Sequence, residues 1–458
     1  MNDDLSIASK ETSGILLIIG LVTILLVHIF FLLPFPITCG VTALYVLVIF
    51  FLHRPLEGFF ALLVIRASVD FLDTYFSVSL SETITLNVAA ILGLLLIAMT
   101  CVLALTHRKD LFRRPLVVSF GLFIIFSAGS IFYSIDQGAT FEETSRIISI
   151  FAAFLGTHIL CIRVPHARKT LITATLFAAI LPLTFAIFQL ASGTGYSDNT
   201  GTEGRLFGTF KHPNSFASFL LVVIALLTYR VFETLSQRYN RNTALTLLGV
   251  TVTILLLTFS RGGWFAFLIF FGLFGLLRAP KVIFVIIAIA VTFFFTSQTV
   301  HDRIEDIYNP PADSSIRWRI QQWKNAVAAW QLSPIYGYGA GTEIAIFEKE
   351  QGYYAGNPYT HNDIIKVLQE TGIIGTGLFL LLLGVTCIRL IKTYHATQNA
   401  SERLFVLIIL LLFIAQIGFG MSSNIWRGTA VQWFLWALIA CALSYNAPRK
   451  NSHQLHKN

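Results

Sequence analysis

"GILLIIGLVTILLVHIFFLL", residues 14–33, contains no Asp, Glu, Lys or Arg. A helix of roughly twenty residues rises about 30 Å, which is the thickness of the hydrocarbon core of a bilayer. The stretch follows an acidic segment and lacks a small-residue cleavage site. We therefore expect a retained membrane helix rather than a cleaved signal peptide.

Similar apolar runs recur along the 458 residues, of which 55% are hydrophobic and 12% charged. Soluble domains carry about 25% charged residues, and strands of a β-barrel alternate polar and apolar residues. The sequence therefore predicts an all-α polytopic membrane protein with 12–14 transmembrane helices. The expected spans lie near residues 14–33, 37–52, 58–76, 84–106, 116–133, 145–162, 170–190, 214–230, 244–259, 263–277, 282–297, 364–389, 403–420 and 429–446.

Basic residues alternate between the two sides of these spans. The termini and every second loop hold twenty of the 32 Lys and Arg residues, whereas the loops at 34–36, 77–83 and 134–144 hold none. The positive-inside rule then predicts that both termini are cytoplasmic. Membrane orientation thus accounts for much of the net charge of +8, and we expect no nucleic-acid partner.

The loop lengths predict the organisation of the chain. Residues 1–297 are expected to form transmembrane helices with short loops, apart from an extracytoplasmic loop at 191–213. Residues 298–363 are expected to form a large extracytoplasmic loop, 364–446 the C-terminal transmembrane helices and 447–458 a cytoplasmic tail. No internal repeat is visible, which disfavours transporter folds built from repeated halves.

The segment "GRLFGTFKHPNSFASFL", residues 204–220, leads from the first of these loops into a span. Pro213 suits the first turn of a helix, and the free N–H groups of Asn214 and Ser215 would lie at the positive end of the helix dipole. With Arg205, Lys211 and His212 they predict an anion-binding site. The alternative is a capped helix start with snorkelling basic residues.

In "TFSRGGWFAF", residues 258–267, Arg261 lies in a short turn between two spans. Gly262 and Gly263 suffice for the turn, so the arginine is surplus to it. The planar guanidinium of arginine matches phosphate oxygens in two-point contacts. The alternative is an interfacial anchor.

Residues 314–342 predict an amphipathic helix followed by a glycine-rich turn. Ile316, Ile320, Trp323, Val327 and Trp330 form one apolar stripe, as in helices that lie flat in a membrane interface. We expect Arg317 and Arg319 to point away from it, into water or towards a bound head group. The alternative is simple surface attachment.

"YTHNDIIKVLQETGIIG", residues 359–375, places ionisable groups at the start of a membrane helix. Lys366 can pair with Asp363 and Glu370 at helical spacing. A histidine of near-neutral pKa, such as His361, can take a proton from an attacking hydroxyl. The alternative is a packing residue at the interface.

Two further groups of charges lie at predicted span ends or within spans. Arg66 and Asp70 predict a buried ion pair inside the span at 58–76, with a polar pathway as the alternative. Arg146 could join the arginines above or pair with Glu142. The outer loops contain no D-x-D motif, and the cytoplasmic side contains no phosphate-binding glycine loop. We therefore expect a diphosphate site that needs no metal and no cofactor.

Several of these motifs resemble the O-antigen ligase and O-antigen polymerase superfamily. "HN", nine residues and "GIIG" are similar to the ligase pattern, "RLFGTFKHPN" and "SRGG" match two further motifs, and "RIQQW" with "PIYGYG" resembles a third pair. The resemblance covers residues 200–380 by motif and the whole chain by topology.

This resemblance implies an inverting, metal-independent glycosyltransferase of the bacterial inner membrane, with a GT-C-like helical fold and an extracytoplasmic active site. Its donor would be a glycan on undecaprenyl diphosphate, and its acceptor would be a hydroxyl of lipid A–core. By matching positions, Arg205 and Arg261 would hold the diphosphate, Arg319 would assist and His361 would activate the acceptor. Asn362 would orient the glycan.

Two alternatives remain open on the sequence. An O-antigen or exopolysaccharide polymerase would use another lipid-linked repeat unit as acceptor, and the shared motifs describe only the donor site. A lipid-linked oligosaccharide flippase or anion transporter would also be basic and polytopic. A transporter, however, is expected to hold its charges near the midplane between halves, whereas these charges gather at one face.

Overall fold

The computed structural model describes most of the chain. The described residues are 20–24, 35–70, 77–79, 85–105, 115–197, 204–233, 238–296, 298, 301, 305, 308, 315–351 and 359–444. Within them the chain is an all-α polytopic membrane protein with one small hairpin. Eight helices are long and apolar enough to cross a membrane, and three shorter ones are also apolar.

Every predicted span from 37–52 onward overlaps a helix, whereas the first span lies outside the described residues except for 20–24. The helices of the first half are α2 (Phe35–His53), α3 (Pro55–Ser68), α4 (Val88–Leu105), α5 (Pro115–Gly129), η2 (Ser130–Phe132), α6 (Gln137–Arg163), α7 (Ala167–Ala178), α8 (Ile180–Ser192) and α9 (Pro213–Glu233). Strands β1 (Ser77–Ser79) and β2 (Thr85–Asn87) pair antiparallel. The second half contains α10 (Arg238–Leu257), α11 (Arg261–Leu277), α12 (Lys281–Thr296), α14 (Ser315–Leu332), α15 (Glu343–Gln351), α16 (Asp363–Ala396), α17 (Ala400–Gly420), η3 (Ile425–Arg427) and α18 (Thr429–Leu443).

Helices α9, α17 and α18 form the core of the bundle. They are apolar on all sides, as expected of helices surrounded by other helices, and most of their side chains are buried. One polar pair joins two of them: Ser218 donates its hydroxyl to Gln416 at 2.8 Å, and the Gln416 amide donates to the Ser218 carbonyl at 2.9 Å. Such reciprocal bonds satisfy polar groups where water is excluded.

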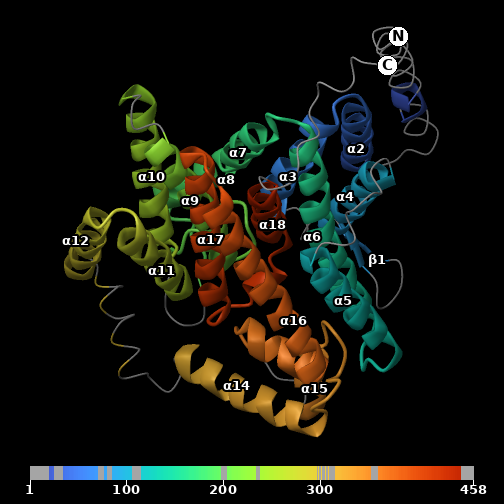
Figure 1. The fold of residues 1–458 in the computed structure, drawn as a ribbon. Helices are drawn as coiled ribbons and strands as arrows, with labels where there is room; N and C mark the ends of the chain where they lie inside the picture. Colours follow the sequence, from blue (N-terminus) through green and yellow to red (C-terminus); the bar gives the residue numbers. More distant parts are fainter. Residues whose placement is uncertain are drawn as a thin grey trace.

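Helices α14 and α15 lie at one end of the bundle, where α14 runs across the helix ends (Figure 1). The stripe predicted for α14 is only partly turned away from the protein. Gln322, Ala326 and Ala329 are buried, Ile320 is 43% exposed, and the other four stripe residues, Ile316, Trp323, Val327 and Trp330, are half-buried. Ile320 thus leaves apolar surface exposed on α14, as an interfacial helix requires.

The predicted span at 170–190 corresponds to one candidate membrane span, Ala167–Ser192, in which the helix is interrupted at Ala179 between α7 and α8, because Pro182 has no N–H to continue the helical ladder. Of the predicted span at 58–76, residues 71–76 lie outside the described part of the chain, and α3 ends at Ser68. The predicted ion pair of Arg66 with Asp70 is present at 2.7 Å, at the end of α3 rather than within it.

Candidate functional site

Arg205 is fixed between two helix ends. Its Nε donates to the carbonyl of Thr258 at 3.0 Å, and Nη2 donates to Oδ1 of Asn214 at 3.3 Å. The side chain is only 6% exposed. Gly204 and Gly208 on either side have positive φ values of 73° and 55°, so the backbone turns sharply around the arginine. The fold thus sets the position of the Arg205 charge.

Asn214 joins this turn to two other segments. Its Oδ1 also accepts from the Ser260 hydroxyl at 2.9 Å, and its Nδ2 donates to the hydroxyl of Ser423 at 3.1 Å. The prediction that its backbone N–H is free for an anion is wrong, because this N–H donates to Nδ1 of His212 at 3.0 Å. The His212 ring therefore caps the first turn of α9.

Arg261 is the first residue of α11, and the Ser260 hydroxyl caps that helix by accepting from the Gly263 N–H at 3.2 Å. Phe259 before it has a φ of 49°, a left-handed conformation that is strained for a bulky residue. The turn is therefore made by Phe259 and Ser260, not by the two glycines as predicted. A Cβ on Gly262 would overlap the hydroxyl of Ser422, so this glycine allows a close approach between α11 and the segment after α17.

His361 also has a left-handed backbone, with a φ of 51°. The residues on both sides of it are anchored. Trp323 of α14 donates its indole N–H to the Thr360 carbonyl at 2.7 Å. Asn362 caps α16 by accepting from the N–H groups of Ile364 and Ile365, and its Nδ2 donates to the Met421 carbonyl at 3.1 Å. The strained conformation of His361 is thus imposed from both sides.

The electrostatic surroundings of His361 differ from the expectation of a near-neutral pKa. Burial is the main cause that lowers the pKa of His361 from 6.5 to about 3, and electrostatic interactions with Arg319 and His212 add to it. The imidazole is therefore neutral at physiological pH. Of the two arginines predicted to point away from the apolar stripe, Arg317 is exposed and Arg319 is partly buried. The structure brings Arg319, His212 and His361 into one electrostatic group.

Lys211 lies at the edge of this group. Its side chain is exposed, and its backbone N–H donates to Oδ2 of Asp70 at 3.4 Å. Thr209 nearby donates its hydroxyl to the Ala67 carbonyl at 3.1 Å. The predicted ion pair of Arg66 and Asp70 therefore supports the 204–214 turn from the end of α3.

A layer of buried charges lies beneath the start of α16. Lys366 pairs with Glu370 at 2.7 Å, as predicted, but its second partner is Glu143 of α6 at 3.3 Å rather than Asp363. Asp363 instead accepts from the backbone N–H groups of Ile425 and Trp426. Arg146 pairs with Glu143, not with Glu142. These contacts fix α16 against α6 and the segment after α17.

The glycine-rich turn after α14 packs closely against Gly372 of α16, so that the two backbones are in contact. Gly372 interrupts α16 with a φ of 62° and a ψ of −164°. At this interruption the backbone carbonyl of Glu370 accepts from the N–H groups of Tyr338 and Gly339 instead of from its own helix. A Cβ on Gly372 would overlap the Ile335 carbonyl. Beside this contact, Tyr133, Tyr336 and Tyr338 line a cavity of about 460 Å³.

Residues 421–428, which connect α17 to α18, contact three of these motifs, although they carry no recognisable motif themselves. Ser423 contacts Asn214, Ser422 meets Gly262, and Met421 accepts from Asn362. Further along, Asn424 donates to the Glu343 carboxylate at 3.0 Å, and Arg427 lies 3.6 Å from it. The available signal was the run "SSN" followed by an arginine between two apolar spans.

Residues 244–380 match the family model described as O-Antigen ligase. This range includes Arg261, Arg319 and His361 and ends before the 421–428 segment. The match supports the O-antigen ligase and polymerase superfamily for this chain. No curated protein matches the chain.

Proposed function

We propose that this chain, as a protein of the O-antigen ligase and polymerase superfamily, transfers a glycan from undecaprenyl diphosphate to a hydroxyl of lipid A–core. The observation that carries the proposal is the convergence of three motifs on residues 421–428. The contacts of Asn214, Gly262 and Asn362 with that segment bring the turns bearing Arg205, Arg261 and His361 together. A membrane glycosyltransferase-type enzyme is what the family match supports.

The proposed roles of the arginines follow from the charge of the leaving group. When the bond between the sugar and the diphosphate breaks, negative charge develops on the diphosphate, and fixed cations in a poorly solvated site stabilise it. Arg205 is held by hydrogen bonds to Thr258 and Asn214. Arg261 begins α11, where the helix dipole adds positive potential. Arg319 lies on α14, near His361, and would act on the diphosphate from that helix.

His361 is proposed to be the base. The acceptor oxygen attacks the anomeric carbon from the face opposite the diphosphate, its proton passes to the neutral imidazole, and the configuration inverts. A pKa of about 3 makes the imidazole a weak base in the free protein. A bound diphosphate would offset the charge of Arg319 that helps to lower this pKa. The base would therefore gain strength only when the donor is present.

The two asparagines and the two basic residues of the α9 turn take more specific roles than the sequence suggested. Asn214 and Asn362 use their side-chain amides to hold the site together, so we propose that they position the catalytic groups rather than bind sugar. Lys211 is exposed at the edge and would attract the anionic donor. His212 caps α9 through Nδ1 and would position the start of that helix beside His361.

The proposed location is the bacterial inner membrane, with both termini cytoplasmic and the site extracytoplasmic. The basic-residue distribution supports this orientation. α14, which exposes Ile320 of its apolar stripe, would lie in the outer interface and hold Arg319 level with the diphosphate of a carrier lipid.

The test uses the purified full chain in nanodiscs with lipid-linked oligosaccharide and two alternative acceptors, lipid A–core and a second lipid-linked repeat unit. Transfer to lipid A–core is the expected result. Chain extension alone would replace the ligase with a polymerase. If neither acceptor is used and the lipid-linked glycan instead moves between leaflets, the chain is a flippase and the proposal is overturned.

A further inference from the structure

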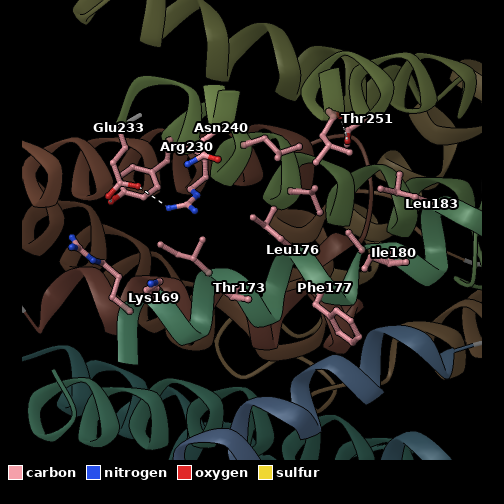
Figure 2. Close-up of a pocket in the computed structure, with 17 residues that line it drawn as sticks. Lys169, Thr173, Leu176, Phe177, Ile180, Leu183, Arg230, Glu233, Asn240 and Thr251 are labelled. Carbon is pink, nitrogen blue, oxygen red and sulfur yellow. Dashed lines mark hydrogen bonds and ion pairs between the residues drawn. The ribbon is translucent and has the colours of Figure 1, made fainter. Parts of the chain in front are cut away.

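A second cavity lies at the opposite end of the bundle. It encloses about 980 Å³ between α7, α8, α9 and α10, and Figure 2 shows its lining. The core helix α9 begins with Pro213 in the candidate site and ends with Glu233 at this cavity. Its length of 21 residues separates the two ends by about 30 Å. The cavity is therefore separate from the candidate site.

The cavity has a cationic mouth. Arg168, Lys169 and Arg230 line it, and Glu233 is the only carboxylate among the described residues of the lining. The Glu233 carboxylate accepts from Tyr229, Ser401 and Arg230. Its charge is therefore largely engaged by the protein, and the mouth keeps an excess of positive charge.

The walls below the mouth are apolar. In Figure 2, Lys169, Arg230 and Asn240 lie at one side, and Ile180 and Leu183 lie at the other. Along α10 the lining runs from Asn240 to Thr251, which corresponds to about 16 Å at 1.5 Å per residue. That depth is half of the roughly 30 Å hydrocarbon core, so the cavity is one leaflet deep.

We propose that this cavity binds an anionic phospholipid. Its phosphate would lie among Arg168, Lys169 and Arg230, and an acyl chain would lie along Leu176, Ile180 and Leu247. The charge excess complements a phosphate, and basic cavities between membrane helices are known to take anionic head groups. The one-leaflet depth fits a phospholipid chain rather than a much longer polyprenyl chain.

The test measures lipid retention by native mass spectrometry on protein transferred from phosphatidylcholine nanodiscs with or without phosphatidylglycerol. Wild-type protein should retain phosphatidylglycerol in preference to phosphatidylcholine. Lys169→Gln and Arg230→Gln should each weaken this binding about fivefold, because a basic residue near a lipid phosphate contributes about 1 kcal/mol. Lys281→Gln, an exposed lysine on α12 that does not line the cavity, is the matched control and should bind as wild type.

A second pair of variants tests the acyl-chain position and does not depend on the charges. Leu247 lines the cavity, whereas Leu245 on the same helix does not, and they are 47% and 46% exposed. Leu247→Trp should fill the wall and abolish the preference, while Leu245→Trp should keep it. Equal binding in wild type and both mouth variants would overturn the proposal. So would competition by glycerol 1-phosphate, which has no chain, or tighter binding of undecaprenyl phosphate than of phosphatidylglycerol.

Discussion

Trp323 donates its indole N–H to the carbonyl of Thr360 at 2.7 Å, so a helix of the large loop holds the residue that precedes His361. The bond links two motifs 37 residues apart. Since His361 has a left-handed backbone, its ring direction depends on how firmly Thr360 and Asn362 are held. α14 therefore does more than present Arg319: it helps to orient the proposed base.

Trp323→Phe should keep the ring and remove this one hydrogen bond. We expect turnover to fall about fivefold, since a typical hydrogen bond contributes about 1 kcal/mol. Trp330→Phe is the matched control, because its indole also donates to a carbonyl, that of Pro334, but away from His361. Initial rates of glycan transfer measure both. Equal losses in the two variants would show that Trp323 acts only in packing.

Arg319→Ala should abolish most transfer, whereas Arg317→Ala should not. The two side chains are on the same turn of α14, but Arg319 is partly buried beside His361 and Arg317 is exposed. Arg319→Lys should recover only part of the rate, because lysine lacks the bidentate geometry of the guanidinium. Wild-type rates in Arg319→Ala would remove this arginine from the site.

Gly372→Ala should destabilise the fold by about 1–3 kcal/mol through its left-handed backbone, and by more through overlap with the Ile335 carbonyl. Gly377→Ala is the control, since a Cβ there meets no atom within 4 Å. Thermal unfolding in detergent, followed by size-exclusion chromatography, compares them. A melting temperature for Gly372→Ala equal to that of Gly377→Ala would contradict the claim that the close backbone contact at Gly372 stabilises the fold.

The lowered pKa of His361 predicts a pH dependence with a definite sign. The folded protein keeps His361 neutral down to about pH 3, whereas the unfolded chain takes up the proton near 6.5. The free energy of unfolding should therefore fall as pH is lowered from about 6.5 towards 3. His361→Gln should reduce that fall, and Arg319→Gln should also reduce it by raising the pKa. If the free energy of unfolding depends on pH identically in wild type and His361→Gln, the lowered pKa of His361 is contradicted.

The sequence predicted what depends on local pattern. The start of α9 at Pro213, the pairing of Lys366 with Glu370 and the helical course of residues 315–332 follow from spacing and composition. Contacts between distant segments were not predictable. Lys366 finds Glu143 across 223 positions, and the side of α14 that contacts the protein depends on where the helix lies.

The site shows the same limit. The charges at Arg205, Arg261 and His361 were visible as motifs, but the 421–428 segment that connects them has no motif of its own. The low pKa of His361 arises mainly from burial. The spacing of residues in the sequence does not predict that burial. Likewise, the capping bond from Asn214 to His212 depends on a ring orientation set by the surrounding fold.

The most direct measurement of the central claim is single-turnover glycan transfer by His361→Asn, with donor binding measured in parallel. Asparagine tolerates the left-handed backbone, so the substitution removes the base without straining the turn. We predict a loss of about 10²–10⁴-fold in turnover, the usual contribution of a general base, with unchanged affinity for the lipid-linked oligosaccharide. Turnover within a few-fold of wild type would contradict the claim that His361 activates the acceptor.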